Sequence, residues 1–191
     1  MWAVAAVVAA VTACGGDAPE AELAADSAEV AGAVPAAPAT PKLGDAEIAH
    51  VAVTANTIDA ELGRLAQTKS QNEAVLAFAQ TMIADHTAVN EQAAQLAQSL
   101  SLTPADNAVS QQLQDGAAAA RTGLEGLSGA AFDQAYVQRE VEYHQAVLDA
   151  LDGVLIPGAQ NTQLRELLQN VRPAFDAHLQ RARQLQGTLG G

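Results

Sequence analysis

The sequence predicts an all-α protein, built as a four-helix bundle with one extra connecting helix. Apolar residues make up 49% of the 191 residues but aromatic residues only 3%, so alanine, the strongest helix former, supplies much of the apolar content. From Asp45 onward, apolar residues recur in steps of three and four, which is typical of a helix face that packs against neighbouring helices. No stretch alternates polar and apolar residues, so we expect no β-sheet.

Charge and cysteine content exclude several classes of protein. Nine basic and twenty-two acidic residues give a net charge of −13. Because such a chain is repelled by phosphate backbones, we expect no nucleic-acid binding. The single Cys excludes an intramolecular disulfide, Cys-based zinc sites and iron–sulfur clusters. The sequence also lacks a nucleophile motif, a phosphate loop and a dinucleotide fingerprint.

The first 44 residues are interpreted as a targeting signal and a linker. Residues 1–13 contain an uncharged apolar run, too short to span a membrane, that fits a signal peptide. The run ends in Val-Thr-Ala-Cys-Gly, which resembles the lipobox of bacterial lipoproteins, so we expect lipidation at Cys14. Gly15 after the cysteine implies, by the same resemblance, an outer-membrane lipoprotein that faces the periplasm. Residues 14–44 are acidic and rich in Pro and Ala, which predicts a disordered linker.

Residues 45–191 are assigned to the helical bundle domain, and polar residues mark where its first helices begin. Asp45 is expected to cap the first helix. Ser70 and Glu73 have the spacing of a capping box, which predicts that the second helix begins almost where the first ends. So short a connection makes the two helices an antiparallel hairpin.

The middle of the domain predicts the connecting helix. Thr103 followed by Pro104 indicates a helix start, and the helix is expected over residues 105–127. About 23 residues of helix span roughly 34 Å, enough to cross from one end of a bundle to the other. A ferritin-like bundle has one such crossover between its second and third core helices, whereas a five-helix up-and-down bundle is the alternative. Ser128 is expected to cap the next helix, and Pro157-Gly158 to close it.

Four stretches resemble a bacterial family. They are Asp-Ala-Glu-Leu-Gly-Arg-Leu-Ala at 59–66, Phe-Ala-Gln-Thr-Met-Ile-Ala-Asp-His at 78–86, residues 132–137 with His144, and Pro173 followed by His178-Leu179. In this order, over residues 45–185, they are similar to domain-of-unknown-function family 4142, a group of "predicted outer membrane proteins". The resemblance implies a ferritin-like fold and an envelope location, and it implies no particular activity. Asp59 stands where the family pattern has Glu.

Three histidines fall on the apolar faces of three different helices: His86, His144 and His178. Because burying an imidazole without a hydrogen bond costs about 1–3 kcal/mol, each ring needs a partner. One interpretation is a polar core network, in which the rings bond carboxylates or carbonyls such as that of Gln169, which Pro173 deprives of its helical donor. The alternative is a mononuclear transition-metal site, since imidazole is the commonest ligand of such ions. Catalysis at that metal is the third interpretation.

Carboxylates near these histidines extend the candidate metal site. Glu140, Asp59 and Glu61 are candidate oxygen ligands. None of the three histidines follows a Glu by three residues, so a ferritin-like di-iron oxidase is disfavoured. Counted from the last turn, His144 lies about 11 residues away and His178 about 16, which predicts an offset of roughly 8 Å along the bundle.

Three further residues are expected to face solvent. His50 falls on the polar face of the first helix, and Tyr136 and Tyr143 are expected to turn their hydroxyls toward water.

We therefore expect a lipid-anchored bundle with a non-enzymatic binding or structural role in the cell envelope. The alternative is a periplasmic metal-binding protein that uses the core histidines for a Zn, Cu or Fe ion. The expected partners are the membrane, through the lipid at Cys14, and an envelope protein or a second copy of the chain.

Overall fold

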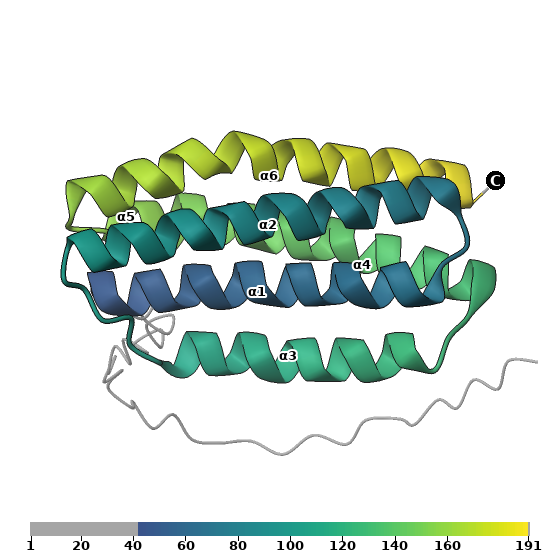
Figure 1. Cartoon of the computed structure of the whole chain (residues 1–191), viewed down its shortest axis with the longest axis horizontal. Helices are drawn as coiled ribbons and strands as arrows, with labels where there is room; N and C mark the ends of the chain where they lie inside the picture. The colour runs from purple at the N-terminus through teal and green to yellow at the C-terminus, as the bar shows by residue number, and fades with distance from the viewer. Residues whose placement is uncertain (1–41, 191) are drawn as a thin grey trace, which may run out of the picture. The chain divides into compact units, whose positions relative to one another are not determined.

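The computed structural model describes residues 42–190, which form helices throughout (Figure 1). The five long helices are α1 (Asp45–Lys69), α2 (Glu73–Ser99), α3 (Ala108–Glu125), α4 (Gly129–Ala150) and α6 (Thr162–Leu189). A π-helical turn η1 (Leu151–Leu155) and the short α5 (Ile156–Gly158) continue α4. The described residues contain no strand, as predicted. The expected signal peptide, Cys14 and nearly all of the linker lie outside them.

The long helices have the ferritin-like arrangement. Helices α1 and α2 form one antiparallel hairpin and α4 and α6 form the other (Figure 1). Helix α3 runs back along α1 and joins the end of α2 to the start of α4, so it is the predicted crossover. Only Ser110 and Leu124 of α3 are buried, whereas each of the other four long helices buries at least five residues. The four-helix core with an extra connecting helix is thus confirmed, and the five-helix up-and-down arrangement is wrong.

The start of α1 is built differently from the prediction. Gly44 is the N-cap, and its N–H donates to Glu47 Oε2 at 2.9 Å. The Asp45 carboxylate instead accepts the backbone N–H groups of Gln160 and Asn161, at 2.7 and 2.9 Å. Asp45 therefore joins the start of α1 to the turn before α6.

The caps of α2 and α3 also lie a few residues beyond the predicted positions. Asn72 Oδ1 accepts the N–H groups of Ala74 and Val75, at 3.0 and 3.4 Å, so Asn72 rather than Ser70 caps α2. Asn107 caps α3, which begins at Ala108 instead of 105 and has 18 residues. Asparagine and serine are similarly good caps, so sequence alone does not distinguish neighbouring positions.

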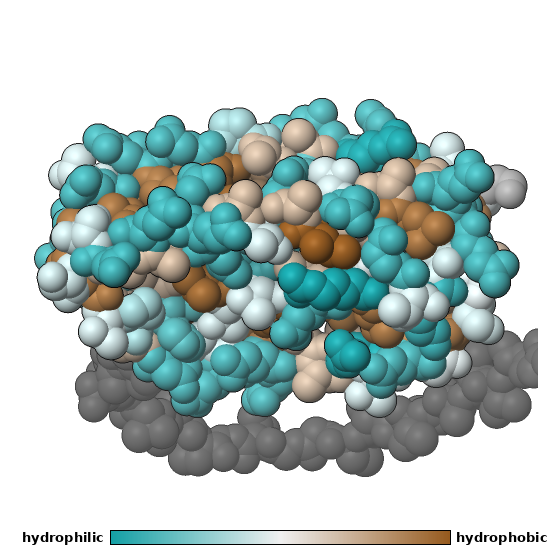
Figure 2. All heavy atoms as spheres, viewed as in Figure 1, coloured by the Kyte–Doolittle hydropathy of each residue, from teal (hydrophilic) through white to brown (hydrophobic). Residues whose placement is uncertain are grey.

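Two apolar clusters fill the core, one toward each end of the bundle. Buried polar residues lie near the boundary between the clusters: on α4, for example, Glu140 and His144 lie between Val137 of one cluster and Leu148 of the other. These polar residues form a layer across the middle of the bundle: Asn56, Asp59, His86, Glu140, His144 and His178. The face seen in Figure 2 is mainly hydrophilic, with small apolar patches. No helix within residues 42–190 combines the length and hydropathy that crossing a bilayer requires.

Candidate metal centre

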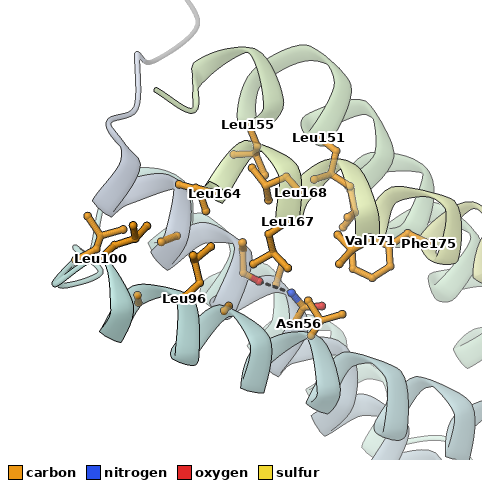
Figure 3. A pocket seen from close by; sticks show the side chains of 18 residues that line it. Asn56, Leu96, Leu100, Leu151, Leu155, Leu164, Leu167, Leu168, Val171 and Phe175 are labelled. Carbon is orange, nitrogen blue, oxygen red and sulfur yellow. Dashed lines mark hydrogen bonds between the residues drawn. The ribbon is translucent and has the colours of Figure 1, made fainter. Parts of the chain in front are cut away.

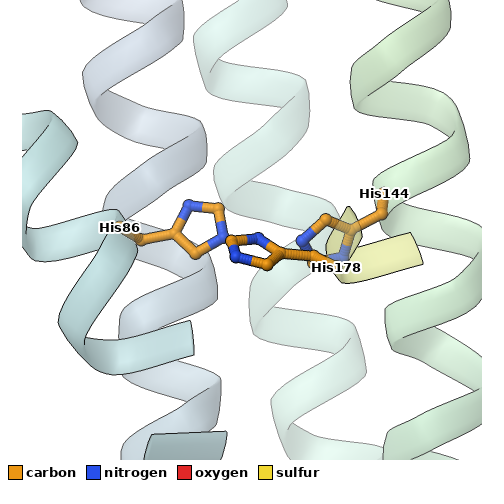
Figure 4. A group of neighbouring side chains, drawn as sticks. All are labelled: His86, His144 and His178. Carbon is orange, nitrogen blue, oxygen red and sulfur yellow. The ribbon is translucent and has the colours of Figure 1, made fainter. Parts of the chain in front are cut away.

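The three histidines of the polar layer converge from three helices (Figure 4). The ring centroids of His86 (α2), His144 (α4) and His178 (α6) lie 5.3 to 5.6 Å apart. One nitrogen of each ring lies within 4.8 Å of a nitrogen of both others. All three side chains are almost fully buried, with exposed fractions of 4%, 1% and 7%.

The predicted offset of roughly 8 Å between His144 and His178 is too large, because the helix that begins as α4 extends beyond Ala150. The helical path continues from α4 through η1 and α5, so His144 lies 14 residues before its end at Gly158. His178 lies 16 residues after the start of α6 at Thr162. A difference of two residues is about 3 Å of helix rise, which side chains span easily.

Asp59 supplies a carboxylate from the fourth core helix, α1. Its Oδ2 lies 3.3 Å from His86 Nε2 and 3.5 Å from His144 Nε2. The side chain has no exposed surface, and neither carboxylate oxygen has a hydrogen-bond partner among the described residues. Asp59 therefore lies beside two of the three imidazoles, and it forms a group of candidate ligand atoms with Glu140 and His144.

The amide of Asn56 fixes the tautomer of His86. Asn56 Nδ2 donates to the Ala52 carbonyl at 2.7 Å, so its Oδ1 faces His86. That oxygen is only an acceptor, and it lies 2.7 Å from His86 Nδ1. The proton therefore resides on Nδ1, and Nε2 presents a lone pair to the interior.

In His144 and His178, too, one ring nitrogen donates a hydrogen bond and the other is left with a lone pair. His144 Nδ1 donates to the backbone carbonyl of Glu140 at 3.0 Å, and His178 Nε2 donates to Asp85 Oδ2 at 2.9 Å. The remaining nitrogens, His144 Nε2 and His178 Nδ1, are buried and have no hydrogen-bond partner. The acceptors are Asn56, Glu140 and Asp85, so the Gln169 carbonyl is not used.

Burial keeps the imidazoles of His86 and His144 neutral. Desolvation lowers the pKa of His86 to about 4, outweighing the attraction of Asp59. Desolvation likewise lowers the pKa of His144. Both rings are therefore uncharged near neutral pH, which is the state that binds a metal.

Glu140 lies beside the histidines and Asp59, and its carboxyl group is protonated. Its fully buried side chain has an unpartnered Oε2 3.5 Å from His144 Nδ1. Burial and the neighbouring Asp59 raise the pKa of Glu140 well above its usual value, and Arg139, at 3.3 Å from Oε1, offsets this only in part. Glu140 therefore carries a proton near neutral pH. Asp59, Glu140 and His144 also form a second group of candidate ligand atoms within 4.8 Å of one another.

The site is consequently rich in acceptors and poor in donors. Asp59 Oδ2 lies against the lone-pair nitrogens of His86 and His144, and acceptors cannot satisfy acceptors. Such a set of acceptors is chemically suited to a divalent cation.

The structure brings five of the six sequence-predicted ligand candidates together. The exception is Glu61, which is exposed and lines a shallow pocket with Arg121 of α3. His50 also lies elsewhere, with Nδ1 3.8 Å from Asp106 and a side chain that is 25% exposed. His50 is therefore partly buried and not fully exposed to solvent.

The expectation that both tyrosine hydroxyls face water is wrong. Tyr136 is fully buried, with its hydroxyl unpartnered among the described residues. Tyr143 donates its hydroxyl to the Ala55 carbonyl at 2.8 Å, and its ring meets His144 edge-on at a centroid distance of 6.2 Å. Burial raises the pKa of both phenols, so they stay protonated.

Sequence reasoning missed the outer partners of the histidines. Asn56 and Asp85 were not singled out, although Asn56 interrupts the apolar face of α1 one turn before Asp59, and Asp85 directly precedes His86. Phe175 of α6 stacks on His86 at a centroid distance of 5.0 Å and an interplanar angle of 24°.

The fold and the buried residues define a ferritin-like bundle with three histidines and two acidic side chains gathered in its core. The family model described as "Domain of unknown function (DUF4142)" matches residues 30–185, and the chain belongs to this family, as its sequence motifs predict. Among solved structures it is similar to the "putative secreted protein DUF305 from Streptomyces coelicolor", with a TM-score of 0.66 and 13% sequence identity. That similarity covers 77% of this chain and 94% of the other, and it concerns the fold alone. Comparison with curated proteins found no match.

Proposed function

We propose that this protein binds one transition-metal ion in the middle of its helical bundle. The ligands are His86 Nε2, His144 Nε2, His178 Nδ1 and the Asp59 carboxylate. The observation that carries the proposal is the direction of the protons. All three rings donate outward, to Asn56, Glu140 and Asp85, and leave a buried, unpartnered nitrogen on each ring, those of His86 and His144 lying against the Asp59 carboxylate.

A polar core network that holds the helices together is the competing function. Such a network is stable when donors meet acceptors, and its members become costly when they do not. Here the inner atoms of His86, His144, His178 and Asp59 lack partners among the described residues. This pattern favours a ligand over a purely structural role.

The donor set narrows the class of metal. Imidazole nitrogen suits Zn, Cu, Ni and Fe, and a single carboxylate is compatible with each. The described residues place no thiolate at the centre, and none of the three core histidines follows a Glu by three residues, as the ferritin-like Glu-x-x-His motif would require. We therefore propose a mononuclear ion of the Zn²⁺, Cu²⁺ or Fe²⁺ kind, bound without catalysis.

We further propose that the protein works in the cell envelope, anchored by a lipid on Cys14. The apolar run before Cys14 and the acidic segment 14–44 support a tethered domain outside the cytoplasm. The description of the Streptomyces structure as a secreted protein is in keeping with that location. A Cys14→Ser variant that still fractionates with membranes would contradict the anchor.

Metal analysis tests the central proposal. Protein purified without chelator is expected to contain about one ion per chain, and the stripped protein to show a thermal shift on addition of Zn²⁺ or Cu²⁺. The double variant His86→Ala, His144→Ala should lose both. His50→Ala, which removes a histidine outside the centre, should keep both. Metal-free wild-type protein with no shift for either ion contradicts the proposal.

A further inference from the structure

The candidate ligands differ in how close they lie to solvent, and this difference bears on how an ion reaches them. Asp59, His144 and His86 have exposed side-chain fractions of 0%, 1% and 4%. His178 is 7% exposed, and its hydrogen-bond partner Asp85 is 48% exposed. The pair formed by His178 and Asp85 is therefore the part of the centre that borders on water.

An open cleft lies over this pair, between α2 and α6. It has a volume of about 450 Å³, and both Asp85 and His178 line it. Its walls include the alanines 77, 174 and 177, whose small side chains leave room between the helices. Pro173, just before this stretch of α6, has no N–H to donate to the Gln169 carbonyl, so this turn lacks one backbone hydrogen bond.

The other cavity near the centre is unsuited to an ion. It lies on the opposite side of the polar layer and is lined by apolar side chains of α1, α2, η1 and α6 (Figure 3). Its volume is only about 40 Å³, and its single polar lining residue is Asn56. The Asn56 amide is already bonded to Ala52 and His86, so it offers nothing to a hydrated cation.

We propose that metal ions reach and leave the centre through the α2–α6 cleft, with Asp85 as the first ligand and His178 as the residue that moves. This inference rests on the proposed metal binding. The exposed Asp85 carboxylate attracts the hydrated ion and exchanges for one of its waters. The His178 side chain then rotates toward the cleft, binds the ion through Nδ1 and rotates back. The ion thereby reaches Asp59, His86 and His144.

The cleft also holds one cationic side chain, which hydrogen-bonds to a residue outside the centre. Arg181 also lines the cleft, but its Nη1 donates to Gln184 Oε1 at 3.3 Å, one turn further along α6. The carboxylate of Asp85 is thus the charged group held directly against a candidate ligand, at 2.9 Å from His178 Nε2.

Rates of metal binding test this route, since an obstructed path slows binding and release equally and leaves the equilibrium unchanged. The probes are Co²⁺, followed by its absorbance in stopped flow, and release of the bound ion to excess chelator. In Ala177→Leu, which narrows the cleft, both rates should fall about tenfold or more, with Kd changed by less than about twofold. In Asp85→Asn the association rate should fall about tenfold because the attracting charge is lost.

Two matched controls separate the route from general effects. Ala93→Leu fills the apolar cavity instead of the cleft, and Asp115→Asn removes an exposed charge on α3. Both should bind at the wild-type rate. If Ala177→Leu fails to fold, as judged by its circular dichroism, Ala174→Leu takes its place. Wild-type rates in both cleft variants would overturn the route. Absence of any binding to the wild-type protein would instead overturn the proposed function itself.

Discussion

Replacing Asp59 with Asn should make the metal-free protein more stable and its metal binding weaker. The carboxylate is fully buried, and the protonated carboxyl group of Glu140 is the one donor that the described residues place beside it. Its Oδ2 faces lone pairs at 3.3 and 3.5 Å, on His86 and His144. Asparagine has the same shape, carries no charge, and places an N–H donor where the two nitrogens need one.

The size of the effect follows from the cost of an unsatisfied buried polar group. Removing that cost is worth about 1–3 kcal/mol, and more when the group is charged. For a domain of this size, each kcal/mol shifts Tm by about 2–4 °C, so Tm should rise by about 2–12 °C. Loss of an ion's direct ligand should weaken Zn²⁺ binding by more than about 100-fold, the upper end of the effect of an outer partner.

Two measurements on each protein give the result. Urea unfolding after removal of metal with chelator reports the free energy of unfolding, and calorimetric titration with Zn²⁺ reports Kd. Asp133→Asn is the matched control, because Asp133 is also buried, at 5% exposure, but lies on α4 away from the centre. It should leave Zn²⁺ binding unchanged. An Asp59→Asn protein that is less stable yet binds Zn²⁺ normally would refute the reasoning, and would make Asp59 a structural partner of the imidazoles.

Three further predictions concern acidity and helix packing. The pKa of Glu140 is raised, so its contribution to stability is present below about pH 4.5 and is lost as the pH rises. The variant Glu140→Gln should therefore be more stable than the metal-free wild type between pH 5 and 8, as measured by urea unfolding. In the Glu140→Gln variant, acidification from pH 6.5 to 4 should lower the free energy of unfolding by up to about 3 kcal/mol through His86. The cause is that the unfolded chain binds a proton that the folded ring, with a pKa of about 4, does not. A free energy of unfolding that stays constant over this pH range would contradict the burial of the ring. Gly63→Ala should destabilise the protein by about 1–3 kcal/mol, because the new Cβ would lie 3.0 Å from the Ala79 carbonyl oxygen where α1 meets α2. The control Gly116→Ala has open space around the new Cβ, so in thermal unfolding it should be neutral or stabilising.

The sequence was sufficient to place the histidines on the inner faces of their helices. Spacing of three and four fixes which residues face the core, and it assigned His86, His144 and His178 correctly to that face. The length of the connecting segment was also sufficient to predict the crossover, even though α3 begins three residues later than expected.

The level of each residue along the bundle was harder to predict, because it depends on where helices end. The α4 rod continues through η1 and α5 to Gly158, and this continuation brings His144 level with His178. The outer partners depend on contacts between helices: Asn56 of α1 meets His86 of α2, 30 residues away in sequence. No local pattern contains that information.

The two apolar clusters also have a consequence for affinity. They hold all four core helices on both sides of the polar layer, so the side chains that would coordinate an ion are ordered by folding itself. Binding then requires little further loss of conformational entropy, and most of the coordination energy remains available for affinity. A bundle that is already rigid should therefore discriminate between ions by their preferred geometry, since it cannot easily reshape itself around a poorly fitting one.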